Sequence, residues 1–382
     1  MLNRLERASL TLATAIALLL PPGSALAQET SLGITEPVKL APFNEAAAAC
    51  TAPQDLQRTL AYVQENEREF LAGVDHGLSA AAADRGLSYE KALAESDVAK
   101  AIAEVDGFTR AKVGAIIATS SDPTAIAPSL RAAIGTGEFV GTIVPPPATL
   151  ILNAPQYQTG KVLADAAIDY IATHLNGRAN VVLLTQDSMQ YLTPRFTAIR
   201  KGLDTLPGVT IIADIAPSPV TRKGGFDTMN TILQANPRGD VDVVLGADAV
   251  VLGALDALRA AGKARPDQFL GGIDGEPAAV AEIKSGDGPY KASIALSSPV
   301  FGYAMGNYAA DWLDGKSVPQ AMDILPVALT KDNLPQYTAD EADPGAVFKD
   351  PARRDLYLRM YGNICYDTRD QYLNFPWSSE AQ

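Results

Sequence analysis

The sequence is poor in the residues that most metal sites and many enzyme active sites require. Its 382 residues include 2 histidines, His76 and His174, which lie in distant parts of the chain. A zinc site built on two histidines one helical turn apart is therefore excluded. The sequence also lacks the P-loop pattern GxxxxGKS/T and the nucleophile elbow GxSxG. We expect no catalytic residue, no metal and no cofactor.

Positive charge is scarce as well. The chain has 31 Lys and Arg residues against 44 Asp and Glu residues, which gives a net charge of -13. An acidic chain without a cluster of basic residues repels phosphate, so we expect no nucleic acid partner. The hydrophobic fraction is 47% and the charged fraction only 20%. This composition is typical of a globular protein with large cores, and the length suggests about two domains.

Residues 1–27 have the composition of a secretory signal peptide. Arg4 and Arg7 precede an apolar stretch that runs from Ala8 to Leu20, and the small-residue tripeptide 25–27 ends the segment. An uncleaved anchor helix is the alternative. The rest of the chain contains no apolar run long enough to cross a membrane, so we expect no membrane insertion after signal cleavage. The mature protein is therefore expected in the periplasm.

The chain has 2 cysteines, Cys50 and Cys365, one near each end. An oxidising compartment favours a disulfide between them, and two unrelated buried thiols are the alternative. Residues 28–56 are irregular and rich in Ala and Pro, and residues 331–382 are polar, with many Asp, Pro, Arg and Tyr residues. We expect both segments to be surface extensions. The C-terminal extension is too aromatic for a disordered tail, and we expect it to pack on the core. Its aromatic residues are Tyr357, Tyr361, Tyr366, Tyr372, Phe375 and Trp377.

Between the extensions, short β-rich apolar runs alternate with segments of helical length, which predicts parallel sheets covered by helices on both faces. The expected strands are 59–64, 113–119, 139–144, 180–184, 209–213, 241–245, 269–273 and 290–295. The expected helices are 68–85, 97–110, 123–134, 158–175, 192–205, 226–235, 249–262, 276–284 and 299–314. The run Pro145–Pro147 separates two groups of such units, and we interpret it as a crossing between two domains.

Several polar residues follow the expected strands, at the sheet edge where ligands bind in open α/β folds. They are Gln64, Asn66, Asp187, Gln190, Asp248 and Asp274.

The order of these segments resembles the periplasmic sugar-binding proteins of ABC importers, in the ribose-binding-like branch of the type I fold. The resemblance covers about residues 59–329. It is carried by the stretch ADAVVLGAL at 247–255, which is similar to the family's NDEMALGAL, and by GIDGEP at 272–277, which is similar to GFDGTP. The segment ASIA at 292–295 resembles the strand that returns to the hinge.

This resemblance implies an α/β fold of two doubly wound parallel-sheet lobes, joined by a hinge that the chain crosses three times. Lobe 1 would comprise residues 57–153 plus 297–323, and lobe 2 residues 154–296 plus 324–330. The N-terminal and C-terminal extensions would lie outside these lobes.

The resemblance also implies a ligand site. Asp274 matches an Asp that accepts hydrogen bonds from sugar hydroxyls, although a turn-forming role is the alternative. Asp248 stands beside the position of a ligand amide, which is Ala247 here. Phe70 matches a ring that stacks on the sugar. The remaining candidates are Arg68 and Arg195 as polar contacts, Ser297 beside the hinge-strand position, and Tyr157, Gln190 and Phe226 as wall residues, with core packing as the alternative for the aromatic ones.

We therefore expect a monomeric, non-enzymatic solute-binding protein that captures a small polar ligand, a sugar or polyol before other classes, by hinge closure. Its partner would be an ABC transporter permease in the inner membrane. A partner of a chemoreceptor or sensor kinase, and a binder of a non-sugar small molecule, remain the alternatives. A sugar-responsive transcription regulator is disfavoured by the signal peptide.

Overall fold

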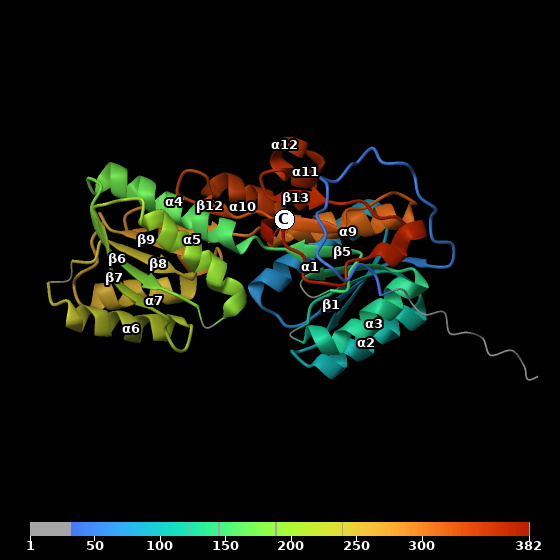
Figure 1. The fold of residues 1–382 in the computed structure, drawn as a ribbon, viewed down its shortest axis with the longest axis horizontal. Helices are drawn as coiled ribbons and strands as arrows, with labels where there is room; N and C mark the ends of the chain where they lie inside the picture. Colours follow the sequence, from blue (N-terminus) through green and yellow to red (C-terminus); the bar gives the residue numbers. More distant parts are fainter. Residues whose placement is uncertain (1–31, 121, 144–145, 188, 239, 382) are drawn as a thin grey trace, which may run out of the picture. The chain divides into compact units, whose positions relative to one another are not determined.

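A computed structural model describes residues 32–381 except 121, 144–145, 188 and 239, so the predicted signal peptide lies outside the described residues. The described chain contains two mostly parallel sheets with helices on both faces (Figure 1). This architecture confirms the predicted fold of two doubly wound α/β lobes. We refer to the lobe of the seven-stranded sheet as lobe 1 and to that of the six-stranded sheet as lobe 2.

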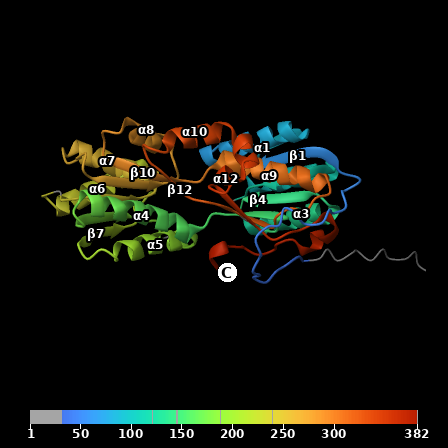
Figure 2. The same ribbon diagram turned by 90° about the horizontal axis from the view of Figure 1, so that it is seen from above.

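In lobe 1 the strand order is β13-β11-β5-β4-β3-β1-β2. All neighbours pair in parallel except β11 and β13. The strands are β1 (Gln57–Gln64), β2 (Ser88–Leu93), β3 (Val113–Ala118), β4 (Phe139–Ile143), β5 (Leu150–Asn153), β11 (Ala321–Ile324) and β13 (Leu358–Tyr361). The helices are α1 (Glu69–Arg85), α2 (Val98–Ala111), α3 (Pro123–Thr136) and α9 (Ser298–Leu313). Helices α1 and α9 pack together on one face (Figure 2), and α2 and α3 pack together on the other (Figure 1).

Lobe 2 repeats this plan, with the strand order β12-β10-β9-β8-β6-β7. Its strands are β6 (Ala179–Leu184), β7 (Val209–Ile215), β8 (Val243–Gly246), β9 (Phe269–Ile273), β10 (Tyr290–Ala295) and β12 (Val327–Leu329). Its helices are α4 (Gln156–His174), α5 (Thr193–Leu203), α6 (Arg222–Ala235), α7 (Asp248–Ala260) and α8 (Pro277–Ser285), with a short 3-10 turn, Gln190–Leu192, before α5. Helices α4 and α5 cover one face, and α6 and α7 the other (Figure 2).

The buried apolar runs explain why these segments become central strands. Every residue of β3 is buried, as is every residue of β8 and β9. A strand covered by helices on both faces has no polar side, so its sequence is continuously hydrophobic. Helix starts follow from local capping: the Asp97 carboxylate accepts hydrogen bonds from the amides of Ala99 and Lys100 at the beginning of α2.

The run Pro145–Pro147 does not mark the crossing between the lobes, so that prediction was wrong. The run connects β4 to β5, and these two strands pair with each other in the same sheet. The chain leaves the seven-stranded sheet only after Asn153, the last residue of β5. Proline excludes a regular strand locally, but it does not require the next strand to belong to another sheet.

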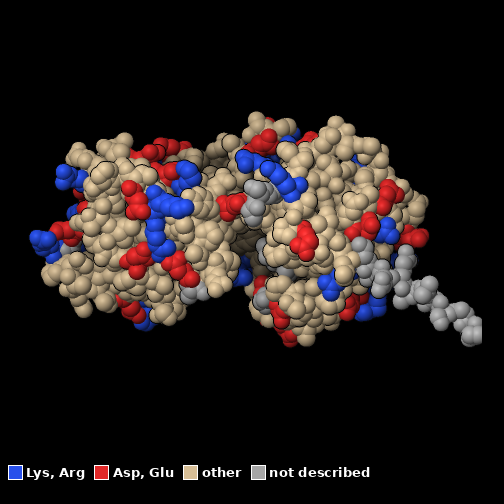
Figure 3. Space-filling view, in the orientation of Figure 1, with Lys and Arg blue, Asp and Glu red and all other residues tan. Residues whose placement is uncertain are grey.

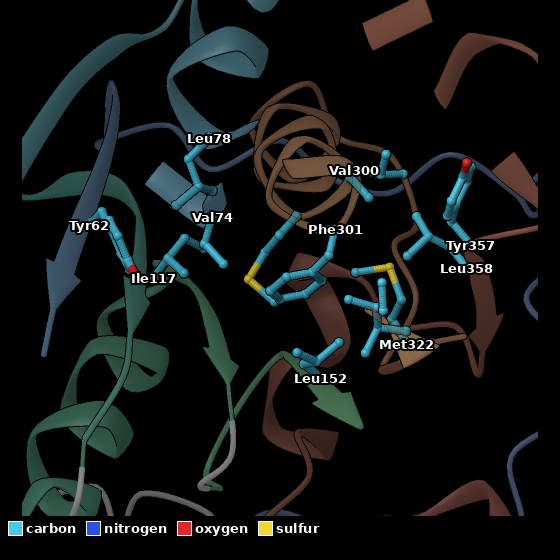
Figure 4. Packing of buried hydrophobic residues seen from close by; sticks show 14 of the residues in the cluster. Tyr62, Val74, Leu78, Ile117, Leu152, Val300, Phe301, Met322, Tyr357 and Leu358 are labelled. Atoms are coloured by element: carbon cyan, nitrogen blue, oxygen red, sulfur yellow. The ribbon is translucent and has the colours of Figure 1, made fainter. Parts of the chain in front are cut away.

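After β10 and β11 the chain passes between the two sheets again, and the C-terminal extension adds a fourth passage. From β12 in lobe 2 the chain runs through α10 (Leu334–Ala342), α11 (Pro344–Lys349) and α12 (Pro351–Arg354) to β13 in lobe 1. Tyr357 and Leu358 are buried beside Val300 and Phe301 of α9 and Met322 of β11 (Figure 4). The extension therefore contributes both a strand and core side chains to lobe 1.

A disulfide joins Cys50 to Cys365, as predicted, with 5.6 Å between the two Cα atoms. The N-terminal extension lies along the same surface as the C-terminal one. The Ile34 amide donates to the Tyr372 carbonyl oxygen at 2.8 Å, and Leu373 exchanges backbone hydrogen bonds with Ala148. The two extensions are thus connected to each other and to lobe 1 by backbone pairing as well as by the disulfide.

Candidate functional site

Asp274 occupies the carboxyl end of the lobe 2 sheet, directly after β9. Its φ is +118°, a value that side-chain-bearing residues rarely adopt, and Gly275 follows with φ +70°. The backbone is held in this conformation by hydrogen bonds from the Asp274 amide to Ile294 and from the Gly275 amide to Ser293. The side chain remains 48% exposed. Strain of this kind is concentrated at functional sites, which makes Asp274 a site candidate on conformational grounds.

Arg195, near the start of α5, extends its guanidinium toward Asp274. The distance from Arg195 Nη1 to Asp274 Oδ1 is 3.8 Å, and Arg195 Nε donates to Gln156 Oε1 at 3.0 Å. The Arg195 side chain is only 6% exposed, and its other N–H groups have no hydrogen-bond acceptor within the described residues. Burial lowers the pKa of Arg195 and Asp274 opposes that shift. A buried cation with free donors next to an accessible carboxylate can donate to and accept from the same polar ligand.

The electrostatics of Asp274 combine two opposing effects. The dense surroundings of its carboxyl group raise its pKa, and the charge of Arg195 lowers it. Because half of the side chain remains open to solvent, the carboxyl group sits in a recess rather than in the core. It can therefore meet a ligand without moving.

Asp248, in contrast, is fully buried and already satisfied by protein donors. Its carboxylate accepts hydrogen bonds from Tyr290 Oη at 2.6 Å, Ser293 Oγ at 2.7 Å and the Glu276 amide at 2.8 Å. Burial raises its pKa to about 7, although these three donors act in the opposite direction. Asp248 thus joins α7, the loop after β9, and β10, and the geometry gives it a structural role beneath Asp274.

The candidates in lobe 1 form a group at the end of β1. Gln64 Nε2 donates to the Asn66 carbonyl oxygen at 2.6 Å, and Asn66 Oδ1 accepts from both the amide and Nε of Arg68 at 3.1 Å. Gln64 is buried, and its Oε1 atom has no partner among the described residues. The Arg68 side chain is 74% exposed. The structure therefore brings these three residues together, each in a local hydrogen bond.

The remaining candidates do not form one cluster. Phe70 and Phe226 are partly buried and pack against the hydrophobic core. Tyr157 and Gln190 are exposed, and the Lys201 ammonium group lies 5.7 Å from the Tyr157 ring centre. Ser297 is fully buried.

Ser297 donates a hydrogen bond to Glu341 Oε1 at 3.3 Å. Its partner thus belongs to α10 of the C-terminal extension, and its hydroxyl group is already engaged.

Sequence reasoning missed Gln156 and three carboxylates. Gln156 is the first residue of α4 and orients Arg195. Glu69 begins α1, Glu276 follows Gly275, and Glu341 lies in α10. Burial raises the pKa of each of these three carboxyl groups. The negative charge of Glu69 also raises the pKa of Glu276 and the pKa of Glu341. The position of Glu276, within the GIDGEP turn, was the one signal available in the sequence.

The chain is similar in sequence to known proteins. The family described as periplasmic binding protein domain matches residues 60–317, which is more than half of the chain. The chain belongs to the periplasmic binding protein domain family. Among curated proteins, the ribose import binding protein RbsB of Bacillus subtilis is 26% identical over 268 residues, covering 66% of this chain and 80% of the relative.

Solved structures share the periplasmic binding protein fold. A periplasmic ribose ABC transporter protein from Conexibacter woesei superposes with a TM-score of 0.62 at 18% identity, covering 74% of this chain and 95% of that one. A solute-binding protein from Bacillus halodurans with bound myo-inositol gives 0.59 at 21% identity, covering 75% and 99%. One from Actinobacillus succinogenes with bound D-allose gives 0.60 at 18% identity, covering 73% and 99%. At these identities the likeness establishes the fold.

On the face shown in Figure 3, basic and acidic side chains are interspersed rather than separated into patches. Many charged side chains of the described chain are paired, as in Arg200 with Asp187 and Asp214, or Arg222 with Asp256. Within the described ranges, no helix combines the length and the apolar character that a membrane span requires.

Proposed function

We propose that this protein is an extracytoplasmic solute-binding protein that captures a small polar ligand between its lobes and delivers it to an ABC importer. The observation that carries the proposal is the Arg195–Asp274 pair, at the carboxyl edge of lobe 2, in a chain of the periplasmic binding protein domain family. A ligand hydroxyl group can donate to the Asp274 carboxylate while a ligand oxygen accepts from Arg195. Sugars and polyols present both groups on neighbouring carbons.

The names of the relatives support this ligand class. RbsB is named for ribose import, and two structural neighbours hold myo-inositol and D-allose. We propose that Gln64, Asn66 and Arg68 approach the ligand from lobe 1, because they lie at the corresponding sheet edge and Gln64 Oε1 has no partner among the described residues. Asp248 and Ser297 serve the same site indirectly, by fixing the loop after β9 and the start of α9.

The proposed lobe boundaries are 57–153 plus 297–323, and 154–296 plus 324–330. Strands β1 to β5 and β11, except its last residue Ile324, fall in the first set, and β6 to β10 and β12 in the second, which supports this division. Residues 1–27 would direct export to the periplasm and then be removed. The protein would work as a monomer, without a cofactor, and the ligand would leave it chemically unchanged.

A ligand screen on residues 28–382 tests this proposal. Sugars, polyols, sugar acids, nucleosides and amino acids are compared by thermal shift, and each hit is followed by calorimetry and by mass spectrometry of the recovered ligand. A ligand present at 100 times its Kd adds about 2.7 kcal/mol of stability, which a thermal shift resolves. We expect a hit among the sugars or polyols, recovered without chemical change.

The Arg195→Lys variant places the hit in the proposed cleft. Lysine keeps the charge but replaces the planar, forked guanidinium group with a compact ammonium group on a flexible stem, so binding should weaken. A hit that is converted to a product would replace the binding proposal with an enzymatic one. Unchanged binding in Arg195→Lys would show that the ligand binds at another site.

A further inference from the structure

The last residues of the C-terminal extension bond the first turn of α4, the helix with which lobe 2 begins. Glu380 Oε1 accepts a hydrogen bond from the Gln158 amide at 2.7 Å, and Glu380 Oε2 accepts from the Tyr157 amide at 3.1 Å. The residue that precedes α4 is Pro155, whose side chain provides no cap. A carboxylate from the other end of the chain therefore satisfies amides that would otherwise lack an acceptor.

The segment that carries Glu380 is anchored on lobe 1. Leu373 pairs with the Ala148 backbone, and the Trp377 ring lies 5.0 Å from the Tyr361 ring, centre to centre. Phe375 and Trp377 are buried in a small cluster with Ile151 of β5 and Ala321 of β11. Only Ser378 and Ser379 lie between Trp377 and Glu380, so the connection spans about 10 Å at full extension. Movement of α4 away from lobe 1 is thus limited by a short, firmly anchored chain.

A buried polar group joins the same segment to two of the crossings between the sheets. The Asp323 carboxylate, on β11, accepts hydrogen bonds from Asn153 Nδ2 at 2.7 Å and from Tyr361 Oη at 3.0 Å. Burial raises the pKa of Asp323, and interaction with the Ser379 side chain opposes that rise. Asn153 is the last residue of β5 before the chain enters α4. The contact of Glu380 with α4 is therefore supported by a second set of bonds at the neighbouring hinge strands.

We propose that residues 378–381 form a strap across the hinge, and that Glu380 is a positioning residue that restrains lobe 2 by holding the first turn of α4. Gln156 of that turn accepts a hydrogen bond from Arg195, the side chain proposed to bind the ligand. The strap therefore also holds the residue that orients Arg195. The inference rests on the proposed function in one respect: the strap affects ligand binding only if the lobes close around the ligand. The restraint itself is a property of the protein without ligand.

The test uses the unliganded protein, so its outcome does not depend on finding a ligand. Ketone-bearing amino acids placed at exposed Ala83 on α1 and Gln234 on α6 carry spin labels, which leaves the disulfide intact. Pulsed dipolar spectroscopy then gives the distribution of distances between the lobes. Hydrogen exchange of the peptide that contains Tyr157 and Gln158 reports on the helix start.

In Glu380→Ala we expect these two amides to exchange about 2- to 5-fold faster, because they lose their acceptors. The distance distribution should widen in the same variant. Glu380→Gln, which retains one acceptor oxygen, should give intermediate values in both measurements. The matched control is Glu90→Ala on β2, since the Glu90 side chain is exposed and makes no hydrogen bond or ion pair with the described residues.

Three results would overturn the strap. Faster exchange with an unchanged distance distribution would reduce Glu380 to a local helix cap. Unchanged exchange of the Tyr157 and Gln158 amides would show that Glu380 does not bond them. Equal widening in Glu90→Ala would assign the effect to loss of surface charge.

Discussion

The lobes follow the same strand order, β2-β1-β3-β4-β5-β11 in lobe 1 and β7-β6-β8-β9-β10-β12 in lobe 2, but their sheets end differently. Lobe 2 ends at β12, three residues long, and its open carboxyl edge carries Arg195 and Asp274. Lobe 1 continues into β13 and is enclosed by two extensions and a disulfide. Two lobes with the same strand order therefore differ in what is added to them. Lobe 1 is stabilised by an extra strand and a disulfide, and lobe 2 carries the candidate ligand-binding pair.

The largest effect should follow from damaging the part of the lobe 1 core that the extension supplies. Leu358 on β13 is 1% exposed, and Leu358→Ala should cost about 2–5 kcal/mol, since it removes buried methyl groups and leaves a cavity. Leu356, two residues earlier, is 62% exposed, and Leu356→Ala should change stability by less than about 0.5 kcal/mol. Urea denaturation measures both. Equal small losses would mean that the extension only rests on lobe 1.

Removal of the disulfide is the second way to test the comparison. The double variant Cys50→Ser/Cys365→Ser should lose about 2–4 kcal/mol, because the unfolded chain is no longer cross-linked. Thermal unfolding of the wild type should respond to a reductant, and the double variant should not. A wild type with the same melting temperature in both conditions would contradict the idea that the disulfide reinforces lobe 1.

The third prediction concerns the buried carboxyl group under the lobe 2 site. The pKa of Asp248 is about 7 in the folded protein against an ordinary 3.8, so the folded state retains the proton more strongly than the unfolded state. This favours folding at acidic pH, and the advantage is lost as the pH rises from about 4 to about 7, by up to about 1.4 kcal/mol per pH unit.

Asp248→Asn cannot ionise, so its stability relative to the wild type should improve between about pH 5 and about pH 8. Denaturation at both pH values measures this, with Asp287→Asn on the same lobe as control, because Asp287 is exposed and unpaired within the described residues. A constant difference between Asp248→Asn and the wild type would show that Asp248 does not titrate in this range.

The smallest effect is expected at a helix start that is capped by a neighbouring residue, in contrast to α4, whose first amides are capped by the distant Glu380. Asp97→Ala should cost about 1 kcal/mol, because the Ala99 and Lys100 amides lose their acceptor at the start of α2. The loss should be local and should leave the distance between the lobes unchanged, unlike the loss of Glu380. Denaturation and the distance measurement on the same protein separate the two cases.

The strands with two buried faces could be predicted from sequence, because their apolar runs are unmistakable. The edge strand β2 could not, since SYEKAL is mostly exposed and polar. Strands β5, β11 and β12 have only three or four residues, too few to show a period. The role of the extension in lobe 1 depends on pairing between β13 and β11, which composition alone does not reveal.

The candidate site was predictable in part. Asp274 was found through the GIDGEP turn, and Arg195 was named as a polar contact without a secure match to the family's motif. The structure places it 3.8 Å from Asp274. Asp248 was expected to face the ligand, but its partners Tyr290 and Ser293 come from β10, a strand distant in sequence. Whether a carboxylate is free or already bonded is a property of the folded arrangement, and the local sequence carries no signal for it.

The central claim is that the open edge of lobe 2 binds the ligand through Asp274. Calorimetry of the sugar or polyol identified by the screen, with Asp274→Ala and Asp287→Asn side by side, tests it most directly. Hydrogen bonds to a charged group contribute about 1.5–3 kcal/mol, so Asp274→Ala should bind about 10- to 100-fold more weakly, and Asp287→Asn should bind like the wild type. Wild-type affinity in Asp274→Ala would contradict the account.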